Sequence, residues 1–252
     1  MKFIGIIPAR YASTRFPGKP LAIINGKSMI QRVYEQVSKS NIFNTTSKDE
    51  SKIIVATEDI NIENHVKNFG GNVMITSNKH KTGTERCFEV VEKLQENYDV
   101  VINIQGDEPY IDPTQIEKLA SCFTNKNIQL ATLLKIITDK DELFDINVVK
   151  AVVNNKKEAV YFSRNPIPFF RGKDKEKWLS FHDYYKHIGI YGYRTDVLKK
   201  IVKFKPTPLE TAESLEQLRW LENALKINIE FTEIDSFSID TYDDLVKVKK
   251  IK

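Results

Sequence analysis

The stretch FIGIIPARYASTRFPGKPL, Phe3–Leu21, joins an apolar run directly to a loop that carries three cations. The run FIGII has the length and the β-branched content of a buried strand. Arg10, Arg15 and Lys19 follow it. Arginine presents a planar fork to phosphate oxygens and lysine a mobile point charge, so this junction suits a polyphosphate. The pattern GxxxxGK[ST] is missing, which excludes a P-loop. The alternative to phosphate binding is a solvated loop whose cations pair with surface carboxylates.

The first half of the chain alternates short apolar runs with amphipathic stretches. This alternation is typical of βαβ units around a mainly parallel sheet. We expect strands at Phe3–Ile7, Lys52–Thr57, Asn72–Ile75, Val100–Ile104 and Leu130–Lys135. Two helical faces lie between them, formed by Met29, Ile30, Val33, Tyr34 and Val37 and by Cys87, Phe88, Val91 and Leu94. The sequence TGTE at Thr82–Glu85 predicts a capping box that opens the second helix.

The pattern changes at about Val148, where two strands around a polar turn and the further strand HIGIYGYR predict antiparallel pairing. One long helix is expected in PLETAESLEQLRWLENALK, followed by a strand in INIEFTEI and a last helix opened by Thr241 and Asp244. We therefore predict a single α/β domain over residues 1–252 with a smaller β-rich lobe at about 148–206.

Composition excludes several classes of protein. The 252 residues are 41% hydrophobic, and the net charge of +4 comes from 38 basic and 34 acidic residues mixed along the chain. A basic arm or stripe is missing, so binding to nucleic acid or to a membrane surface is not expected. Two isolated cysteines suggest neither a disulfide framework nor a zinc site. Without a signal-peptide pattern or an apolar run of about 18 residues, we expect a soluble, cytoplasmic protein.

Carboxylates end two of the apolar runs. Asp107 follows the fourth expected strand in NIQGDEP, and Asp240 ends the run FSID. In open α/β sheets, ligands bind beyond the carboxyl ends of the strands. The loop that carries Arg10, Arg15 and Lys19, which we call the cationic loop, also lies there. Mg²⁺ typically takes one or two protein carboxylates together with phosphate oxygens, so these groups form a coherent site. A turn-forming Asp107 and a helix-capping Asp240 are the alternatives.

The chain resembles the 3-deoxy-manno-octulosonate cytidylyltransferase family, the CMP-KDO synthetases. Seven motifs carry the resemblance in order from Pro8 to Leu245: PARYASTRFPGKPL, HKTGTER, NIQGDEP, YFSR, HIGIYGYR, ESLEQLR and IDTYDDL. The resemblance implies a Rossmann-like, glycosyltransferase-A-like nucleotidyltransferase fold, usually dimeric, whose β-rich lobe serves sugar binding and dimerisation. It also implies a reaction of CTP with 3-deoxy-D-manno-oct-2-ulosonate (KDO) that gives CMP-KDO and pyrophosphate for lipopolysaccharide synthesis.

The resemblance assigns roles on the nucleotide side of the site. Lys19 is implied in stabilising charge as pyrophosphate departs, and Asp107 and Asp240 in holding Mg²⁺. Either Arg86 or Gln105 would contact the cytosine, although Arg86 could instead pair with Glu89. The residues implied in holding the triphosphate are Arg10, Ser13, Arg15 and Lys19.

On the sugar side, Arg164 ends the strand of YFSR and suits the carboxylate of the sugar acid. The alternating positions of His187, Tyr191 and Tyr193 place all three on one face of a strand. By match to the family, His187 and Tyr191 would contact the sugar, as would Glu216 and Gln217 of the expected long helix. Packing roles for the two strand residues and a surface position for the helix residues are the alternatives.

Other functions stay open from the sequence. A cytidylyltransferase for another acidic sugar, such as amino-KDO or a sialic acid, would use the same nucleotide motifs, while YFSR, HIGIYGYR and ESLEQLR favour KDO. A non-catalytic nucleotide-binding module would not need two strand-end aspartates. The family commonly has Asp where Glu58 stands, and we assign no role to that loop.

Overall fold

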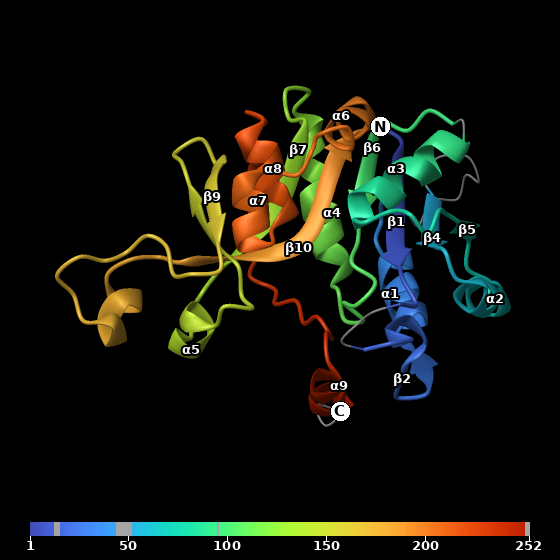
Figure 1. Cartoon of the computed structure of the whole chain (residues 1–252), viewed down its shortest axis with the longest axis horizontal. Helices are drawn as coiled ribbons and strands as arrows, with labels where there is room; N and C mark the ends of the chain where they lie inside the picture. Colours follow the sequence, from blue (N-terminus) through green and yellow to red (C-terminus); the bar gives the residue numbers. More distant parts are fainter. Residues whose placement is uncertain (13–15, 44–51, 95, 250–252) are drawn as a thin grey trace.

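The computed structural model describes residues 1–12, 16–43, 52–94 and 96–249. Its centre is a nine-stranded mixed sheet (Figure 1), with the order β11-β7-β10-β6-β1-β4-β5 and with β8 and β9 branching from β10. The strands are β1 (Phe3–Ala9), β4 (Lys52–Thr57), β5 (Val73–Ile75), β6 (Val100–Asn103), β7 (Leu130–Ile136), β8 (Lys150–Val153), β9 (Ala159–Ser163), β10 (Tyr185–Arg194) and β11 (Asn228–Phe231). All five strands expected in the first half are present, with ends that differ by at most two residues.

Most strands of this sheet run in one direction. β1 pairs in parallel with β4 and β6, β4 with β5, and β7 with β11. β10 is antiparallel to β6, β7 and β8, and β9 is antiparallel to β8, so only β9 and β10 of the nine strands run the other way. The prediction of a mixed, mainly parallel α/β sheet is confirmed.

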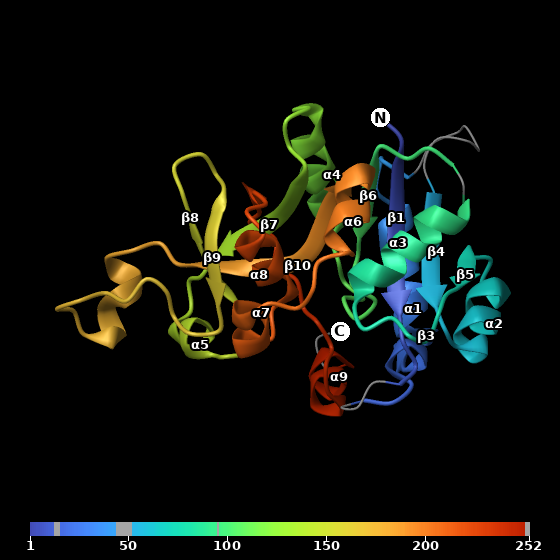
Figure 2. The same ribbon diagram turned by 45° about the horizontal axis from the view of Figure 1, so that its top comes forward.

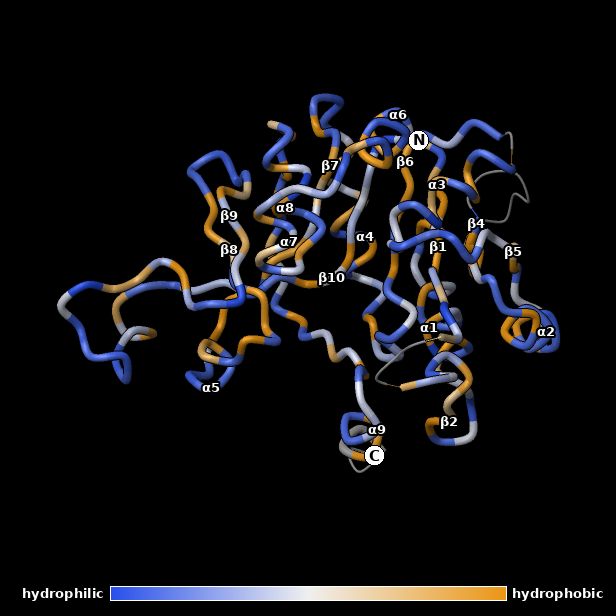
Figure 3. The backbone as a smooth tube through the Cα atoms, in the orientation of Figure 1, coloured by the Kyte–Doolittle hydropathy of each residue, from blue (hydrophilic) through white to orange (hydrophobic). Residues whose placement is uncertain are grey.

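Helices cover both faces of the sheet, because side chains alternate along each strand. In β1, Ile4 and Ile6 face a core with α3 (Gly83–Leu94), α6 (Thr195–Ile201) and α8 (Glu216–Glu222). Ile7 and Ala9 face the opposite core, with α1 (Met29–Ser38), α2 (Ile60–Asn68) and α4 (Pro113–Ser121). Hydrophobic residues follow the central strands in Figure 3. Across the described residues, no helix has the length and apolarity needed to cross a membrane.

The hairpin of β8 and β9 and the segment 164–184 project from the body (Figures 1 and 2). A small core holds this part together, formed by Ile137, Leu143, Trp178 and Tyr184 beside α5 (Lys140–Phe144) and the 3-10 helix Lys175–Ser180. The predicted lobe at about 148–206 also included β10 and α6. These two elements belong to the main sheet and its covering layer, because β10 pairs with both β6 and β7.

The prediction of a single long helix in PLETAESLEQLRWLENALK was wrong. The segment forms α7 (Pro208–Glu213) and α8, separated at Ser214, which adopts the left-handed conformation with φ 53°. At the start of α7, Thr207 N donates to the Glu210 carboxylate at 3.3 Å, and the Arg219 guanidinium of α8 pairs with the same carboxylate. The break turns the start of α8 toward β10, and this start carries two predicted site residues.

Two capping boxes are confirmed. In α3, Glu85 N donates to Thr82 Oγ1 at 3.2 Å, and Thr82 N donates to the Glu85 carboxylate at 3.3 Å. Before α9 (Tyr242–Lys249), Asp244 N donates to Thr241 Oγ1 at 3.2 Å and Thr241 N to Asp244 Oδ2 at 2.9 Å. Both boxes fix the direction of chain segments that enter the site.

Gly106 lies where the chain after β6 passes close to β1. A Cβ at this position would stand 2.7 Å from the backbone oxygen of Pro8, closer than real Cβ contacts allow. The neighbouring atom belongs to the backbone of a central strand and cannot rotate away. Glycine is therefore required for the approach that brings Asp107 to the end of β1.

We expect Gly106→Ala to lower the free energy of unfolding by roughly 1–3 kcal/mol, the usual cost of overpacking. Urea unfolding monitored by circular dichroism measures the change. Gly189→Ala is the matched control: its Cβ would meet only side-chain atoms, Glu108 Oε1 at 3.3 Å and Gln105 Cγ at 3.5 Å, which can shift more easily than backbone. Equal losses in the two variants would contradict the argument.

Candidate functional site

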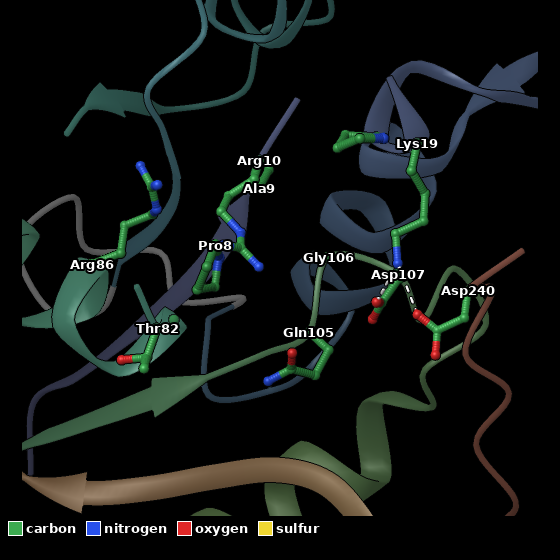
Figure 4. Close-up of a pocket in the computed structure, with 12 residues that line it drawn as sticks. Pro8, Ala9, Arg10, Lys19, Thr82, Arg86, Gln105, Gly106, Asp107 and Asp240 are labelled. Atoms are coloured by element: carbon green, nitrogen blue, oxygen red, sulfur yellow. Dashed lines mark hydrogen bonds and ion pairs between the residues drawn. The ribbon is translucent and has the colours of Figure 1, made fainter. Parts of the chain in front are cut away.

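A polar cavity of about 230 Å³ opens beyond the carboxyl ends of β1 and β6 (Figure 4). Its walls come from the end of β1, the 3-10 helix η1 (Lys19–Leu21), the start of α3, the chain after β6 and the chain that leads into α9. We call it the nucleotide-side cavity. The residues that line it are Pro8, Ala9, Arg10, Lys19, Pro20, Thr82, Gly83, Arg86, Gln105, Gly106, Asp107 and Asp240.

Lys19 contacts both strand-end aspartates. Its Nζ lies 2.6 Å from Asp107 Oδ2 and 3.2 Å from Asp240 Oδ1, and Figure 4 shows the two carboxylates converging on the ammonium. A central cation offsets the repulsion between the two negative groups. The structure thus brings these three predicted site residues together at one wall of the cavity.

Backbone contacts bring the two aspartates together although they lie far apart in sequence. Ile239 N donates to Asp107 O at 2.9 Å, which places Asp240 beside the end of β6. The cap of α9 comes from Thr241 and Asp244, so capping by the Asp240 side chain is not needed to begin that helix.

The cationic loop is held at both ends. Gly18 N donates to Tyr11 O at 3.0 Å, and Tyr11 N donates to Glu58 Oε1 at 3.3 Å. Arg10 is exposed and lines the cavity. The predicted site residues Ser13 and Arg15 lie outside the described residues.

Arg86 is buried at the wall of the cavity. One guanidinium nitrogen pairs with Glu58 Oε2 at 2.7 Å, and another donates to Thr76 Oγ1. Burial lowers the pKa of Arg86 from its usual value, and the nearby Glu58 opposes that shift. The alternative pairing with Glu89 is not the one formed, since Glu89 pairs with Lys93 at 2.7 Å.

A second cavity of about 390 Å³ adjoins the first and shares Gln105 and Asp107 with it. We call it the sugar-side cavity. Its other walls come from β10, the start of α8, the segment 147–149 and the chain before α9. It brings together the predicted residues His187, Tyr191, Glu216 and Gln217.

His187 and Tyr191 lie on one face of β10, as alternation predicts, with ring centroids 5.1 Å apart. His187 Nε2 lies 2.9 Å from Thr132 Oγ1, and burial lowers the pKa of His187 to about 3. The Tyr191 hydroxyl is buried and has no hydrogen-bond partner among the described residues. Tyr193 is fully buried, and its hydroxyl accepts a hydrogen bond from Asn103 at 3.4 Å, which is a packing role.

Gln217 is buried and Glu216 is half-buried, so neither lies on the fully exposed face of an amphipathic helix. Thr84 Oγ1 of α3 donates to Glu216 Oε2 at 2.9 Å, and this bond joins the walls of the two cavities. Burial raises the pKa of Glu216, while hydrogen bonds from Thr84 and Thr82 oppose the increase.

Among the residues that the sequence analysis expected to bind the sugar, Arg164 lines neither cavity. Its guanidinium donates to three backbone oxygens, those of Glu213 at 2.7 Å, Ile146 at 3.1 Å and Ser214 at 3.4 Å. It thus ties the end of β9 to the break between α7 and α8. In this arrangement Arg164 supports the wall of the sugar-side cavity from behind.

Sequence reasoning missed three charged residues of the site. Glu58 joins the cationic loop to Arg86, although the departure from the family's usual Asp had led us to assign that loop no role. Glu108 lines the sugar-side cavity, and burial together with the charge of Asp107 raises its pKa to about 8. Lys186 lines the same cavity and pairs with Glu142 and Asp235, contacts between distant segments that no local pattern indicates.

The lowered pKa of His187 predicts a loss of stability in acid. The folded pKa of about 3 lies below the unfolded value of about 6.5, so the unfolded chain binds the extra proton between these values. Stability is therefore full above pH 6.5 and falls as the pH is lowered. Between pH 6.5 and 5 the loss should be roughly 1–2 kcal/mol, and His187→Gln should remove it.

Urea unfolding of wild type and His187→Gln at pH 7 and pH 5 measures this difference. His182→Gln, which alters an exposed histidine of the projecting segment, serves as the control and should respond to pH like the wild type. If His187→Gln lost as much stability as the wild type on acidification, the neutral state of the His187 imidazole in the folded protein would be refuted.

The chain is similar to known proteins along most of its length. Residues 4–227 match the family model described as cytidylyltransferase. The 3-deoxy-manno-octulosonate cytidylyltransferase of Parabacteroides distasonis is 55% identical over 98% of this chain and 96% of its own length. The enzyme of the same name from Bacteroides thetaiotaomicron is 53% identical over 97% of this chain and 96% of its own length.

Solved structures extend the comparison. A CMP:2-keto-3-deoxy-manno-octonic acid synthetase complexed with CTP superimposes with a TM-score of 0.88 at 38% identity, covering 100% of this chain and 98% of the other. A cytidylyltransferase from Leptospira borgpetersenii, 18% identical over 99% of this chain and 85% of its own, shares the fold with a TM-score of 0.63. From the sequence matches and the fold together, the chain belongs to the cytidylyltransferase family, among the 3-deoxy-manno-octulosonate cytidylyltransferases.

Proposed function

We propose that the protein transfers CMP from CTP to the anomeric C2 hydroxyl of KDO, giving CMP-KDO and pyrophosphate. The observation that carries this proposal is the shared wall of Gln105 and Asp107 between two cavities of different character. Cations and strand ends form one cavity, and aromatic, amide and carboxyl groups form the other. A nucleotide and a polyhydroxylated acid placed in them would meet at that wall.

The reaction requires positioning more than covalent help from the protein. The C2 oxygen attacks the α-phosphorus, and the bond from that phosphorus to the bridging oxygen of pyrophosphate breaks in line. Holding the two reactants in this arrangement converts a bimolecular step into an effectively unimolecular one. Arg10, Arg15 and Lys19 would bind the triphosphate, and Lys19 would stabilise the charge on departing pyrophosphate.

Asp107 and Asp240 are the residues that would hold Mg²⁺. Both carboxylates already converge on one cation, the Lys19 ammonium, so their placement fits a positive ion between them. Two carboxylates with substrate phosphate oxygens form the usual ligand set of this metal. When bound, Mg²⁺ neutralises charge on the phosphates and lowers the pKa of a coordinated hydroxyl.

The remaining predicted site residues are divided between the nucleotide and the sugar in the same way as the two cavities. Ser13 would assist the phosphate cations, and Arg86 or Gln105 would contact cytosine from the wall of the nucleotide-side cavity. His187, Tyr191, Glu216 and Gln217 would contact the sugar, and Arg164 would orient its binding through the helix break that it holds. We place this reaction in the cytoplasm, within a single domain over residues 1–252.

The deciding experiment incubates the protein with CTP, Mg²⁺ and KDO and follows pyrophosphate release. Parallel reactions replace KDO by sialic acid or amino-KDO, and CTP by UTP. We expect release with CTP and KDO and little with the other pairs. Release with sialic acid and none with KDO would identify a different acidic sugar as the substrate, and nucleotide binding without release would identify a non-catalytic module.

Loss of either aspartate should abolish most Mg²⁺-dependent turnover without unfolding the protein. We expect Asp107→Ala and Asp240→Ala each to lower kcat by roughly 100-fold or more, since the metal supplies several kcal/mol of charge stabilisation. Steady-state kinetics measures the loss, and circular dichroism monitors the fold. Glu35→Ala, which removes a surface carboxylate paired with Lys27 at 2.6 Å, is the control. A folded, near-fully active Asp240→Ala enzyme would contradict the metal assignment.

We also propose that the protein is a homodimer formed through its β-rich lobe. Large apolar side chains are exposed on this projecting part, including Phe169, which is 71% exposed. Val160 and Phe181 are exposed on the same part. Covering them by a second copy would remove apolar area from water.

Sedimentation velocity at micromolar protein should show a dimer for the wild type and a shift toward monomer for Phe169→Asp. Ile60→Asp is the control, because Ile60 is a similarly exposed apolar residue of α2, at the opposite end of the molecule. A wild-type monomer, or equal effects of the two variants, would contradict the proposed interface.

A further inference from the structure

β10 contains an irregularity where it passes the sugar-side cavity. Ile188 pairs with Leu133 of β7, but Tyr191 pairs with the next residue of β7, Thr132, so Gly189–Ile190 are extra on β10. Such bulges disrupt the ladder locally and redirect side chains beside functional sites. The fully buried Thr132 hydroxyl lies at this bulge.

The hydrogen bonds of Thr132 determine which of its partners accept a proton and which donate one. Its Oγ1 lies 2.7 Å from Ile190 O, 3.3 Å from Ile188 O and 2.9 Å from His187 Nε2. A hydroxyl has one proton, and carbonyl oxygens can only accept, so this proton goes to the bulge carbonyls. Thr132 must then accept a hydrogen bond from His187, which requires a proton on Nε2.

A neutral imidazole carries a single ring proton, so a proton on Nε2 leaves Nδ1 as an acceptor. The ring packs against Phe162 and Tyr191, with ring centroids 5.3 and 5.1 Å away, and these apolar surroundings disfavour the charged form. No described residue donates a hydrogen bond to Nδ1. His187 lines the sugar-side cavity, where a ligand can reach it.

We propose that Thr132 is a positioning residue that fixes His187 in its Nε2–H tautomer, so that Nδ1 accepts a hydrogen bond from a hydroxyl of the bound sugar. This inference rests on the proposed function. The tautomer of His187 also restricts the orientation of the sugar. A lone-pair acceptor binds a hydroxyl but has no proton to offer a carboxylate, so the acid group of the sugar must point away from His187.

Thr132→Val tests the proposal because valine keeps the shape of threonine and removes the hydroxyl. We expect the KM for KDO to rise about tenfold, the usual effect of a lost buried hydrogen bond, while the KM for CTP stays within about twofold. Thr132→Ser keeps the hydroxyl and should restore the wild-type KM. Thr195→Val is the matched control, since it removes a hydroxyl that donates to Tyr98 O at the far end of β10.

Two further measurements separate positioning from a merely structural role. ¹⁵N NMR of the histidines in the wild-type protein should show His187 with a protonated Nε2 and an unprotonated Nδ1. Thr132→Val should have no additional effect on the KM for KDO in a His187→Ala background, because Thr132 acts through that ring. NMR on the wild type and on Thr132→Ser keeps the test valid even if the valine variant does not fold.

Each outcome decides the inference. Protonation of Nδ1 in the wild type, or equal and additive effects of Thr132→Val with and without His187, would overturn it. A tenfold KM effect on CTP as well as on KDO would show a general structural role and would also overturn it. A wild type that releases no pyrophosphate with any sugar acid would instead refute the proposed function, and the NMR measurement would still decide the tautomer.

Discussion

The contact of one ammonium with two carboxylates organises this site. Lys19 joins the loop after β1, the end of β6 and the chain that enters α9, three segments far apart in sequence. Two aspartates this close together would repel each other without a cation between them. Gly106 and the hydrogen bond from Ile239 to Asp107 place the carboxylates, and the ammonium balances their charge. The wall of the nucleotide-side cavity that these three residues form depends on this balance of charge.

The two cavities come from different parts of the architecture. Parallel strand ends form the nucleotide side, as in open α/β sheets generally. The sugar side is formed by the antiparallel β10 and by α8, whose start is turned by the break at Ser214. Arg164 holds this break from behind, while the bond from Thr84 to Glu216 connects the two walls. A common wall and the hydrogen bond from Thr84 to Glu216 therefore connect the two cavities.

Patterns confined to a few residues were predictable from the sequence. Apolar runs located β4 at its observed ends, and Thr82 and Thr241 marked true helix starts. The break at Ser214 was not predicted, because the amphipathic pattern continues through it and Ser has no special preference for the left-handed conformation. Glu58 and the orientation of Arg164 were missed for another reason. Their partners lie on other segments, and only the folded chain brings those segments together.

The wall shared by the two cavities has a consequence for the end of the reaction cycle. In the proposed arrangement, each substrate would occupy one cavity, and the nucleotide sugar that they form would extend across both, past Gln105 and Asp107. This product would keep contacts that the two substrates make separately, whereas pyrophosphate would keep only those of the cationic loop. The nucleotide sugar would then leave only when its contacts in both cavities are broken. The shared wall that aligns the reactants would thus also hold the larger product more firmly than the smaller one.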